Sequence, residues 1–362
     1  MCLSMLGLIL SKIPFFYFLY FRPVDGDDLE LPENAYLIVD EAIPTLGVIT
    51  LYRFATLELQ DSMDHVINCT HIFLHGGQLI AGEVVNNVDP VFEHSITINL
   101  LGDPQTYDYP LPQGPVMGAK SIGVFGRLKL KGKDTNIAWT KLGATASVGT
   151  NTLVLSNPVD WSVGATIMVT TSSYVAHEAE KLTIDTISDD GLTITTIENL
   201  AYTHAVATDT YDTDTITTAP EVALLSRKIK IVGAPYANQT LDEFGCRVIV
   251  GQFSRDGEVY TGDAILENVE FVNCGQRGFT ENYDPRYSLA FLDVGATGYD
   301  SIVRRCSFNH NYNFGLGVFG TEGLLLEVLL SFSMHISIFN PMVLTYKYYS
   351  RKMSCTELLV MV

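Results

Sequence analysis

Basic residues are scarce in this 362-residue sequence. It contains 22 lysines and arginines against 41 aspartates and glutamates, which gives a formal net charge of −19 at neutral pH. Proteins that bind nucleic acid gather Lys and Arg on one face, where these residues neutralise phosphates. The charge balance therefore argues against a nucleic-acid partner. An acidic surface of this kind also repels other polyanions.

Cysteine spacings that bind metals are absent as well. None of the six cysteines forms a Cys-x-x-Cys pair or joins a histidine at a zinc-site spacing. Cys246, Cys274 and Cys306 recur at intervals that would place them on neighbouring turns of a repetitive fold. Two alternatives follow for these three: a disulfide among them, or buried free thiols, because Cys is among the most buried residue types.

Helical periodicity is also missing. Charged residues make up only 17% of the chain, and Val, Ile, Thr and Tyr dominate its middle, a composition typical of strands and turns. Short apolar runs recur, such as HIFLHGGQLIAG and KSIGVFGRLKLKG. Glycines such as Gly76, Gly77 and Gly126 lie near the corners of these runs, where φ > 0 is cheap only for Gly. The sequence therefore predicts an all-β protein.

The spacing of these runs predicts the arrangement of the strands. Comparable runs follow one another at roughly 20 to 25 residues, the period expected of a parallel β-helix. We predict a right-handed parallel β-helix (solenoid), with residues 25–138 and 219–323 as its two parts. A jelly roll or a β-sandwich is the all-β alternative.

Residues 139–218 interrupt the pattern. They read as paired antiparallel strands, with the turn Ser-Asp-Asp-Gly at 188–191 between TID and LTI. We predict an inserted antiparallel β unit, a small barrel or clip. Trp139 and Trp161 are expected to pack this unit onto the solenoid, because large aromatic side chains usually supply core area.

The two ends differ from the middle. Residues 1–24 are apolar but are broken by Lys12 and Pro14, which suits neither a signal peptide nor a membrane helix. An anchor, a signal and an incorrect start site remain alternatives for this segment. Residues 324–362 lose the Gly and Asn punctuation, so we expect this tail not to belong to the fold and the protein to continue differently beyond Gly323. Membrane anchoring would come from the N-terminal segment or from sequence missing here.

Several phrases resemble a known family. VDEAIPTLGVITLYRFATLEL, HIFLHGGQLIAGE, GAKSIGVFGRLKLKG and NPVDWSVGATIMVTTSSY occur in this order. They resemble the domain named for its eight glycines, which occurs in the fibrocystins and the cell-surface hyaluronidases. The resemblance spans about residues 25–323, and GPVMGAK, IGVFG and GVFGTEGL are most similar to the fibrocystin-L branch.

The resemblance implies a parallel β-helix and an extracellular or cell-surface location reached through the secretory pathway. In that pathway the sequons at Asn68 and Asn238 are candidate glycosylation sites.

The family also includes enzymes that cleave hyaluronan, and in these a strand resembling YPIHFH carries two histidines on one face. This chain has Ala290 and Leu292 at the matching positions after Tyr287. The imidazoles that could transfer protons or bind a metal are missing, which argues against an enzyme. If there is a polysaccharide-cleaving site, the candidate residues are Glu281, Asp284, Arg286, Tyr287 and His310; a turn with a structural ion pair is the alternative for them.

Acidic groups elsewhere suggest few other sites. An acidic run precedes the first predicted strand and consists of Asp25, Asp27, Asp28 and Glu30. Calcium is the candidate cofactor for this run because it prefers oxygen ligands. The simpler interpretation is a solvated turn. His177 beside Glu178 and Glu180 is a weak cation candidate, and Asp209, Asp212 and Asp214 are expected in an exposed loop.

The combined interpretation is an extracellular ectodomain that binds a glycan or protein partner and has a structural role in a pericellular coat. A hyaluronan-type polysaccharide depolymerase is the alternative function. A fragment without a function of its own is the third.

Overall fold

The computed structural model describes residues 4–5, 8–10, 22–81, 91–109, 111, 113–133, 135, 137–278, 284–297, 300–327, 330–332 and 337–338. Regular structure in these residues is almost entirely β-strand; the helical segments among them are the 3-10 turn η1 (Ala176–Glu178) and the short α1 (Gln239–Asp242). The prediction of an all-β protein is confirmed. No helix in the described ranges has the length and apolarity needed to cross a membrane.

The chain divides into two compact units. The first comprises residues 1–133 and 227–362, and the second comprises residues 134–226. The second unit thus extends a few residues beyond each end of the predicted insertion.

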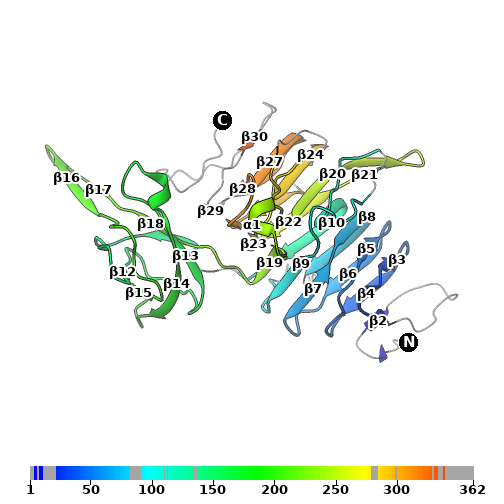
Figure 1. Ribbon diagram of the computed structural model, residues 1–362, viewed down its shortest axis with the longest axis horizontal. Helices are drawn as coiled ribbons and strands as arrows, with labels where there is room; N and C mark the ends of the chain where they lie inside the picture. The colour runs from blue at the N-terminus through cyan, green and yellow to red at the C-terminus, as the bar shows by residue number, and fades with distance from the viewer. Residues whose placement is uncertain are drawn as a thin grey trace. The chain divides into compact units, whose positions relative to one another are not determined.

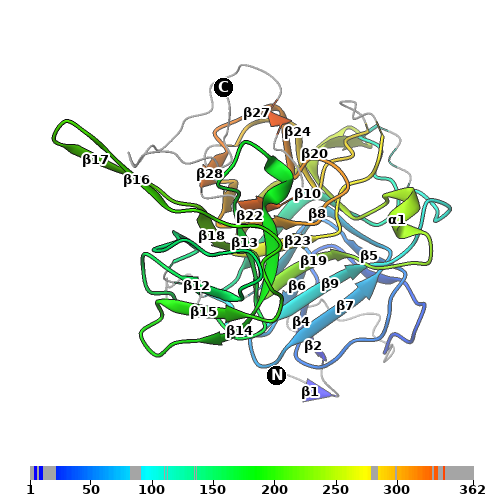
Figure 2. The same ribbon diagram turned by 60° about the vertical axis from the view of Figure 1, so that its left-hand side comes forward.

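Three sets of parallel strands build the first unit, because each successive turn of the chain adds a strand to each set (Figures 1 and 2). The first set is β3 (Leu29–Leu31), β5 (Val48–Leu51), the start of β8 (His71–Ala81) and of β10 (Ser121–Lys131), β20 (Arg247–Arg255), β24 (Leu289–Ala296), β27 (Leu316–Glu322) and β30 (Ser337–Ile338). The second set is β4 (Tyr36–Val39), β6 (Thr56–Leu59), the ends of β8 and β10, β22 (Asp263–Glu267), β25 (Ile302–Arg304) and β28 (Leu325–Glu327). The third set is β7 (His65–Cys69), β9 (Ile96–Leu100), β19 (Ile229–Gly233), β23 (Val269–Val272), β26 (Ser307–Asn309) and β29 (Leu330–Phe332).

In-register stacking of apolar side chains makes the core of this unit. In the first set, Ile72, Ile122, Val248, Leu289 and Leu316 are consecutive partners across five strands, and all are fully buried. Parallel strands buried in this way need Val, Ile and Leu at each equivalent position. Alternating apolar positions within the sequence runs therefore do point into the core of this unit.

A few strands depart from the parallel pattern. At the N-terminal end β2 (Leu8–Leu10) pairs antiparallel with β1 (Ser4–Met5) and with β4. Beside β20, the strand β21 (Glu258–Thr261) folds back as an antiparallel hairpin. This hairpin forms one wall of the groove in the next section.

The described residues beyond Gly323 include three further strands. Strands β28, β29 and β30 pair in parallel with β25, β26 and β27. Leu324 is buried and Leu326 packs against the core of the unit. Apolar side chains at the inward positions suffice to extend the stack, even without the glycine punctuation of the earlier turns.

An antiparallel six-stranded sheet forms the second unit. Its strands, in sheet order, are β11 (Trp139–Lys141), β18 (Glu221–Leu224), β13 (Thr166–Val169), β14 (Glu180–Ile187), β15 (Thr193–Thr196) and β12 (Thr152–Val154). The predicted hairpin at 188–191 is confirmed, since Ile187 pairs with Ile194. Trp161 belongs to this unit's own core and donates its indole N–H to the Ile137 carbonyl at 2.6 Å.

Candidate functional site

A groove of about 720 Å³ lies at a corner of the first unit, between the two halves of β8 and β10 and the β21 hairpin. We call it the paired-charge groove. The side chains and backbone that line it are those of Arg53, Phe54, Gly76, Gly77, Gln78, Phe125, Gly126, Arg127, Glu258, Val259, Tyr260, Thr261 and Asp263.

Glycine backbone forms part of this groove because no side chain fits there. The pairing of β8 with β10 shifts register between Phe125 and Arg127, where the two long strands turn the corner. A Cβ on Gly126 would lie 2.0 Å from the Gly77 carbonyl oxygen, and Gly76 has φ +74°. Both observations require glycine. The groove therefore presents bare backbone between its charged side chains.

Two arginine–carboxylate pairs span the groove. Arg53 Nη1 lies 2.8 Å from Glu258 Oε2, and Arg127 Nε lies 2.8 Å from Asp263 Oδ1. Burial raises the pKa of Asp263, although the guanidinium of Arg127 offsets part of that rise. The hydrogen bond to Asp263 in turn raises the pKa of Arg127. Both arginines are already engaged with acids inside the protein.

Aromatic rings border the same groove. Phe54 is 63% exposed, an unusual position for a large apolar side chain, and the Arg53 guanidinium lies 5.0 Å from its ring centroid. Tyr260 stacks on Phe253 and donates its hydroxyl to Glu258 Oε2 at 3.1 Å. The groove therefore combines one exposed aromatic ring, Phe54, with a half-buried one, Tyr260, next to the Arg53–Glu258 pair.

Sequence reasoning missed this groove. It singled out Gly76, Gly77 and Gly126 as corner glycines but assigned no role to Arg53 or Glu258. The sequence feature that could have indicated the groove is the match between HGGQL and VFGRL, because it places glycine corners side by side on neighbouring turns. Which distant side chains meet over such a corner depends on the strand register.

The predicted catalytic set is only partly brought together. Asp284 contacts Arg247 Nη1 at 2.6 Å and Arg286 Nη2 at 2.9 Å. Burial alone would raise the pKa of Asp284, but the guanidiniums of Arg247 and then Arg286 outweigh it and lower the pKa. A carboxylate held ionised by two cations is a poor proton donor. This geometry favours the structural alternative.

His310 has partners of its own outside that set. His310 Nδ1 hydrogen-bonds to Asn273 Oδ1 at 3.0 Å, and its ring contacts Tyr312. Glu281 lies outside the described residues.

Ala290 and Leu292, at which the resemblance would place two histidines, are apolar and buried. Phe291 points into the core of the unit, so Ala290 and Leu292 face the opposite side of β24. There they belong to a buried cluster that also includes Tyr287 and Phe125. That side of the sheet is therefore filled by packed side chains at these positions.

The acidic run before β3 has structural partners. Asp25 accepts the Thr45 N–H at 2.8 Å, Asp28 accepts the Val48 N–H at 2.6 Å, and Asp27 accepts the Val24 N–H at 2.9 Å. The bonds of Asp25 and Asp28 join the turn to the following turn of the chain, and the bond of Asp27 closes the turn itself. The described ranges contain no group of three or more His, Cys, Asp or Glu side chains arranged to hold a metal ion.

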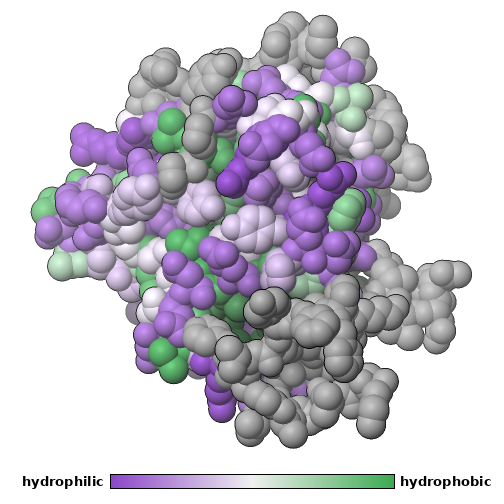
Figure 3. Space-filling model, turned by 90° about the vertical axis from the view of Figure 1, so that its right-hand side faces the viewer, coloured by the Kyte–Doolittle hydropathy of each residue, from purple (hydrophilic) through white to green (hydrophobic). Residues whose placement is uncertain are grey.

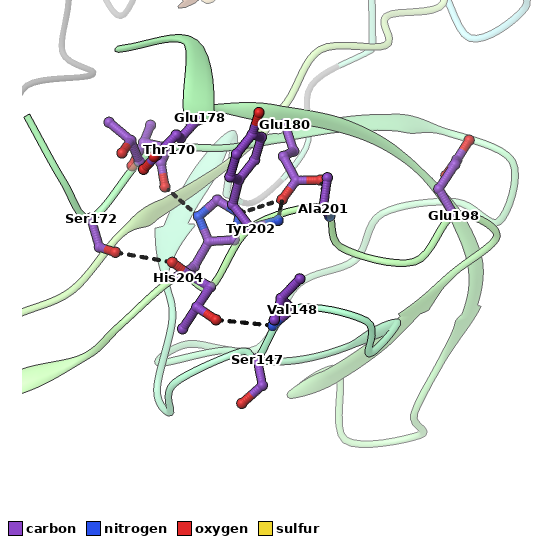
Figure 4. A network of polar contacts seen from close by, with 12 residues as sticks. Ser147, Val148, Thr170, Ser172, Glu178, Glu180, Glu198, Ala201, Tyr202 and His204 are labelled. Carbon is purple, nitrogen blue, oxygen red and sulfur yellow. Dashed lines mark hydrogen bonds and ion pairs between the residues drawn. The ribbon is translucent and has the colours of Figure 1, made fainter. Parts of the chain in front are cut away.

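Glu180, one member of the predicted cation site at His177, has a different histidine as its partner. His177 is exposed, and the neighbouring Glu180 turns instead to the buried His204, whose Nε2 lies 2.9 Å from Glu180 Oε1 (Figure 4). Glu180 also accepts the backbone N–H groups of Ala201 and Tyr202. Sequence reasoning assigned no role to His204, which lies 24 residues from its partner.

The structure describes both the predicted cysteines and the two predicted glycosylation sites. Cys246 and Cys274 form a disulfide, and Cys306 is a buried free thiol whose pKa burial raises to about 12. Asn238 is exposed beside α1, whereas Asn68 is half-buried in β7 and accepts a hydrogen bond from Asn99 Nδ2 at 2.8 Å.

These features define an all-β protein of parallel sheets with an inserted antiparallel unit and a polar groove. The family model described as the G8 domain matches residues 19–143. The human (Homo sapiens) protein fibrocystin-L is 37% identical over 324 residues, which cover 85% of this chain and 7% of that protein. Mouse (Mus musculus) fibrocystin is 30% identical over 320 residues, which cover 84% of this chain and 7% of that protein.

The chain therefore carries a G8 domain and is fibrocystin-L-like over 85% of its length. It spans 7% of the length of fibrocystin-L. Among solved structures, tailspike gp61 of Pseudomonas phage phi297 is similar with a TM-score of 0.24 and 11% identity, over 75% of this chain and 43% of that one.

Proposed function

We propose that this chain is an extracellular, cell-surface domain that binds a glycan in the paired-charge groove and serves a structural role in a pericellular coat. In this proposal the three parallel strand sets are the faces of a right-handed β-solenoid. The observation that carries the proposal is the groove itself, where exposed Phe54 lies beside two fixed arginine–carboxylate pairs.

The charges in the groove favour a neutral glycan. Arg53 and Arg127 each have an acidic partner, so neither offers an unneutralised cation to a polyanion. Sugar hydroxyls both donate and accept, and can bridge a guanidinium and a carboxylate at once. The net charge of −19 would in addition repel an acidic polysaccharide.

Several observations support the extracellular location. The chain is similar to fibrocystin-L, it carries an exposed sequon at Asn238, and it contains the Cys246–Cys274 disulfide. Disulfides persist mainly in oxidising compartments. The coloured residues in Figure 3 are mostly hydrophilic, with smaller hydrophobic areas between them.

A hyaluronan-type depolymerase is the weaker alternative. Its general acid would have to be a carboxyl group that is protonated at working pH. Asp284 is instead held ionised, and Ala290 and Leu292 replace the histidines of the cleaving relatives.

A panel of immobilised neutral and acidic oligosaccharides, probed with the secreted full chain, separates these functions. We expect binding to neutral glycans and no shortening of soluble hyaluronan. Cleavage of hyaluronan by the folded chain would establish the alternative. A folded chain that binds none of the neutral glycans would overturn the proposal.

A further inference from the structure

The second unit carries a two-stranded hairpin that is separate from its six-stranded sheet. Strands β16 (Ala207–Tyr211) and β17 (Asp214–Thr218) pair only with each other in the described part of the chain. All ten strand residues are exposed. In Figures 1 and 2 the hairpin extends away from the six-stranded sheet of its own unit. We call it the acidic ribbon.

An isolated two-stranded hairpin is at best marginally stable in water. The ribbon has no apolar face buried against its unit that would offset the entropy of ordering it. Tyr211 and Ile216 are nevertheless large apolar side chains and are 63% and 56% exposed. A surface of this kind gains most from a partner that covers it.

The register shows what the ribbon offers. Tyr211 pairs with Asp214 across the two-residue turn, so the alternate pairs Thr210–Thr215 and Thr208–Thr217 should direct their backbone N–H and C=O groups outward. The Thr208 and Thr217 hydroxyls lie 3.2 Å apart, as expected for the closer side chains of such pairs. Both edges of the ribbon therefore present outward-facing backbone groups for another strand.

Charge selects the partner. The ribbon and its turn contain Asp209, Asp212 and Asp214 and no Lys, Arg or His. On one face, Asp209 and Asp214 flank the pair of apolar side chains, Tyr211 and Ile216. A second copy of this chain would place aspartate against aspartate, in a molecule that already carries a net charge of −19. An approaching strand with alternating basic side chains would neutralise them.

We infer that the acidic ribbon is a β-augmentation site for a basic strand edge of another polypeptide domain. Backbone hydrogen bonds along Thr208–Thr210 or Thr215–Thr217 would supply the affinity, and the three aspartates would select Lys- and Arg-bearing strands. This site is separate from the paired-charge groove, and it holds whether or not that groove binds a glycan.

The test uses the full chain and an eight-residue peptide of alternating Lys and Val, with a Glu-Val peptide as the probe control. Affinity is measured by titration, and the bound edge by hydrogen exchange at residues 207–218. The double variant Thr210→Pro/Thr215→Pro removes only outward-facing N–H groups and should weaken binding of the basic peptide at least about tenfold. The control Thr210→Val/Thr215→Val retains these N–H groups and should bind the peptide as tightly as the parent chain.

Charge is tested with a matched pair of hairpins. Asp209→Asn/Asp214→Asn should weaken binding of the basic peptide about tenfold and reduce the salt dependence of that binding. The control Asp189→Asn/Asp190→Asn, in the turn between β14 and β15, should leave the affinity and its salt dependence unchanged. Equal binding by the proline and valine variants would overturn the inference, because the contact would then be general attraction to an acidic protein. Dimerisation that the proline variant abolishes would overturn it in favour of a second copy.

Discussion

His204 and Glu180 are in direct polar contact inside the second unit. His204 is fully buried, its Nε2 lies 2.9 Å from Glu180 Oε1, and its Nδ1 lies 2.8 Å from the Thr170 carbonyl oxygen. Each ring nitrogen thus lies within hydrogen-bond distance of an oxygen atom. Figure 4 shows the ring held between these two oxygens.

Loss of one partner of this pair should be costly. Glu180→Gln replaces the carboxylate that contacts His204 and accepts two backbone N–H groups, and weakening of such a buried polar contact typically costs about 1–3 kcal/mol. Glu178→Gln, on the neighbouring surface, is the matched control and should change stability by less than about 0.5 kcal/mol. Urea unfolding of the second unit measures both. Equal stabilities of the two variants would show that the pair contributes nothing beyond a surface contact.

His75 should make stability of the first unit depend on pH. Its ring lies among Tyr52, Phe73, Phe253 and Tyr260, and neither ring nitrogen has a hydrogen-bond partner in the described residues. Burial, and then the Arg255 charge, lower its pKa, while Asp256 acts in the opposite direction.

Because the folded-state pKa of His75 lies below the unfolded value of 6.5, unfolding takes up a proton at acid pH. Stability should therefore fall as pH drops below that value. His75→Phe should flatten the slope of unfolding free energy between pH 7.5 and 5.5, and His177→Phe, an exposed control, should not. An unchanged slope in His75→Phe would assign the pH dependence to other groups.

The Cys246–Cys274 bond should stabilise the first unit. It closes a loop with a sequence separation of 28, for which chain-entropy arguments give about 3–4 kcal/mol. Peptide mapping without reduction should recover the two cysteines in one linked fragment. The double variant Cys246→Ala/Cys274→Ala should unfold at lower urea, while Cys306→Ala should retain the linked fragment. Recovery of Cys306 in a disulfide would contradict this pairing.

Only one of the two sequons should carry a glycan. Asn238 is exposed beside a short helix, whereas the Asn68 side chain accepts a bond from Asn99 within the parallel stack. In chain secreted from animal cells, Asn238→Gln should lower the intact mass by one N-glycan and Asn68→Gln should not. The reverse result would mean that β7 does not pack as described.

Much of the fold was readable from the sequence, but the groove was not. Alternating apolar positions such as those around Ile122 predict β-strands, and the turn at 188–191 predicts one hairpin. Both features can be recognised because they are local in the sequence. The contact between Arg53 and Glu258 joins residues 205 positions apart and depends on the registers of several strands. Asp284 looked available for chemistry because the sequence does not show that Arg247, 37 residues away, neutralises it.

The groove is tested most directly by titrating the neutral glycan that binds best into the parent chain and into Phe54→Ala. Tyr174→Ala, which removes an even more exposed aromatic ring on the second unit, is the control. Removal of one stacking ring should weaken binding about tenfold, equivalent to about 1.4 kcal/mol, with Tyr174→Ala unchanged. If Phe54→Ala remains folded and binds the glycan as tightly as the parent chain, the paired-charge groove is not the binding site.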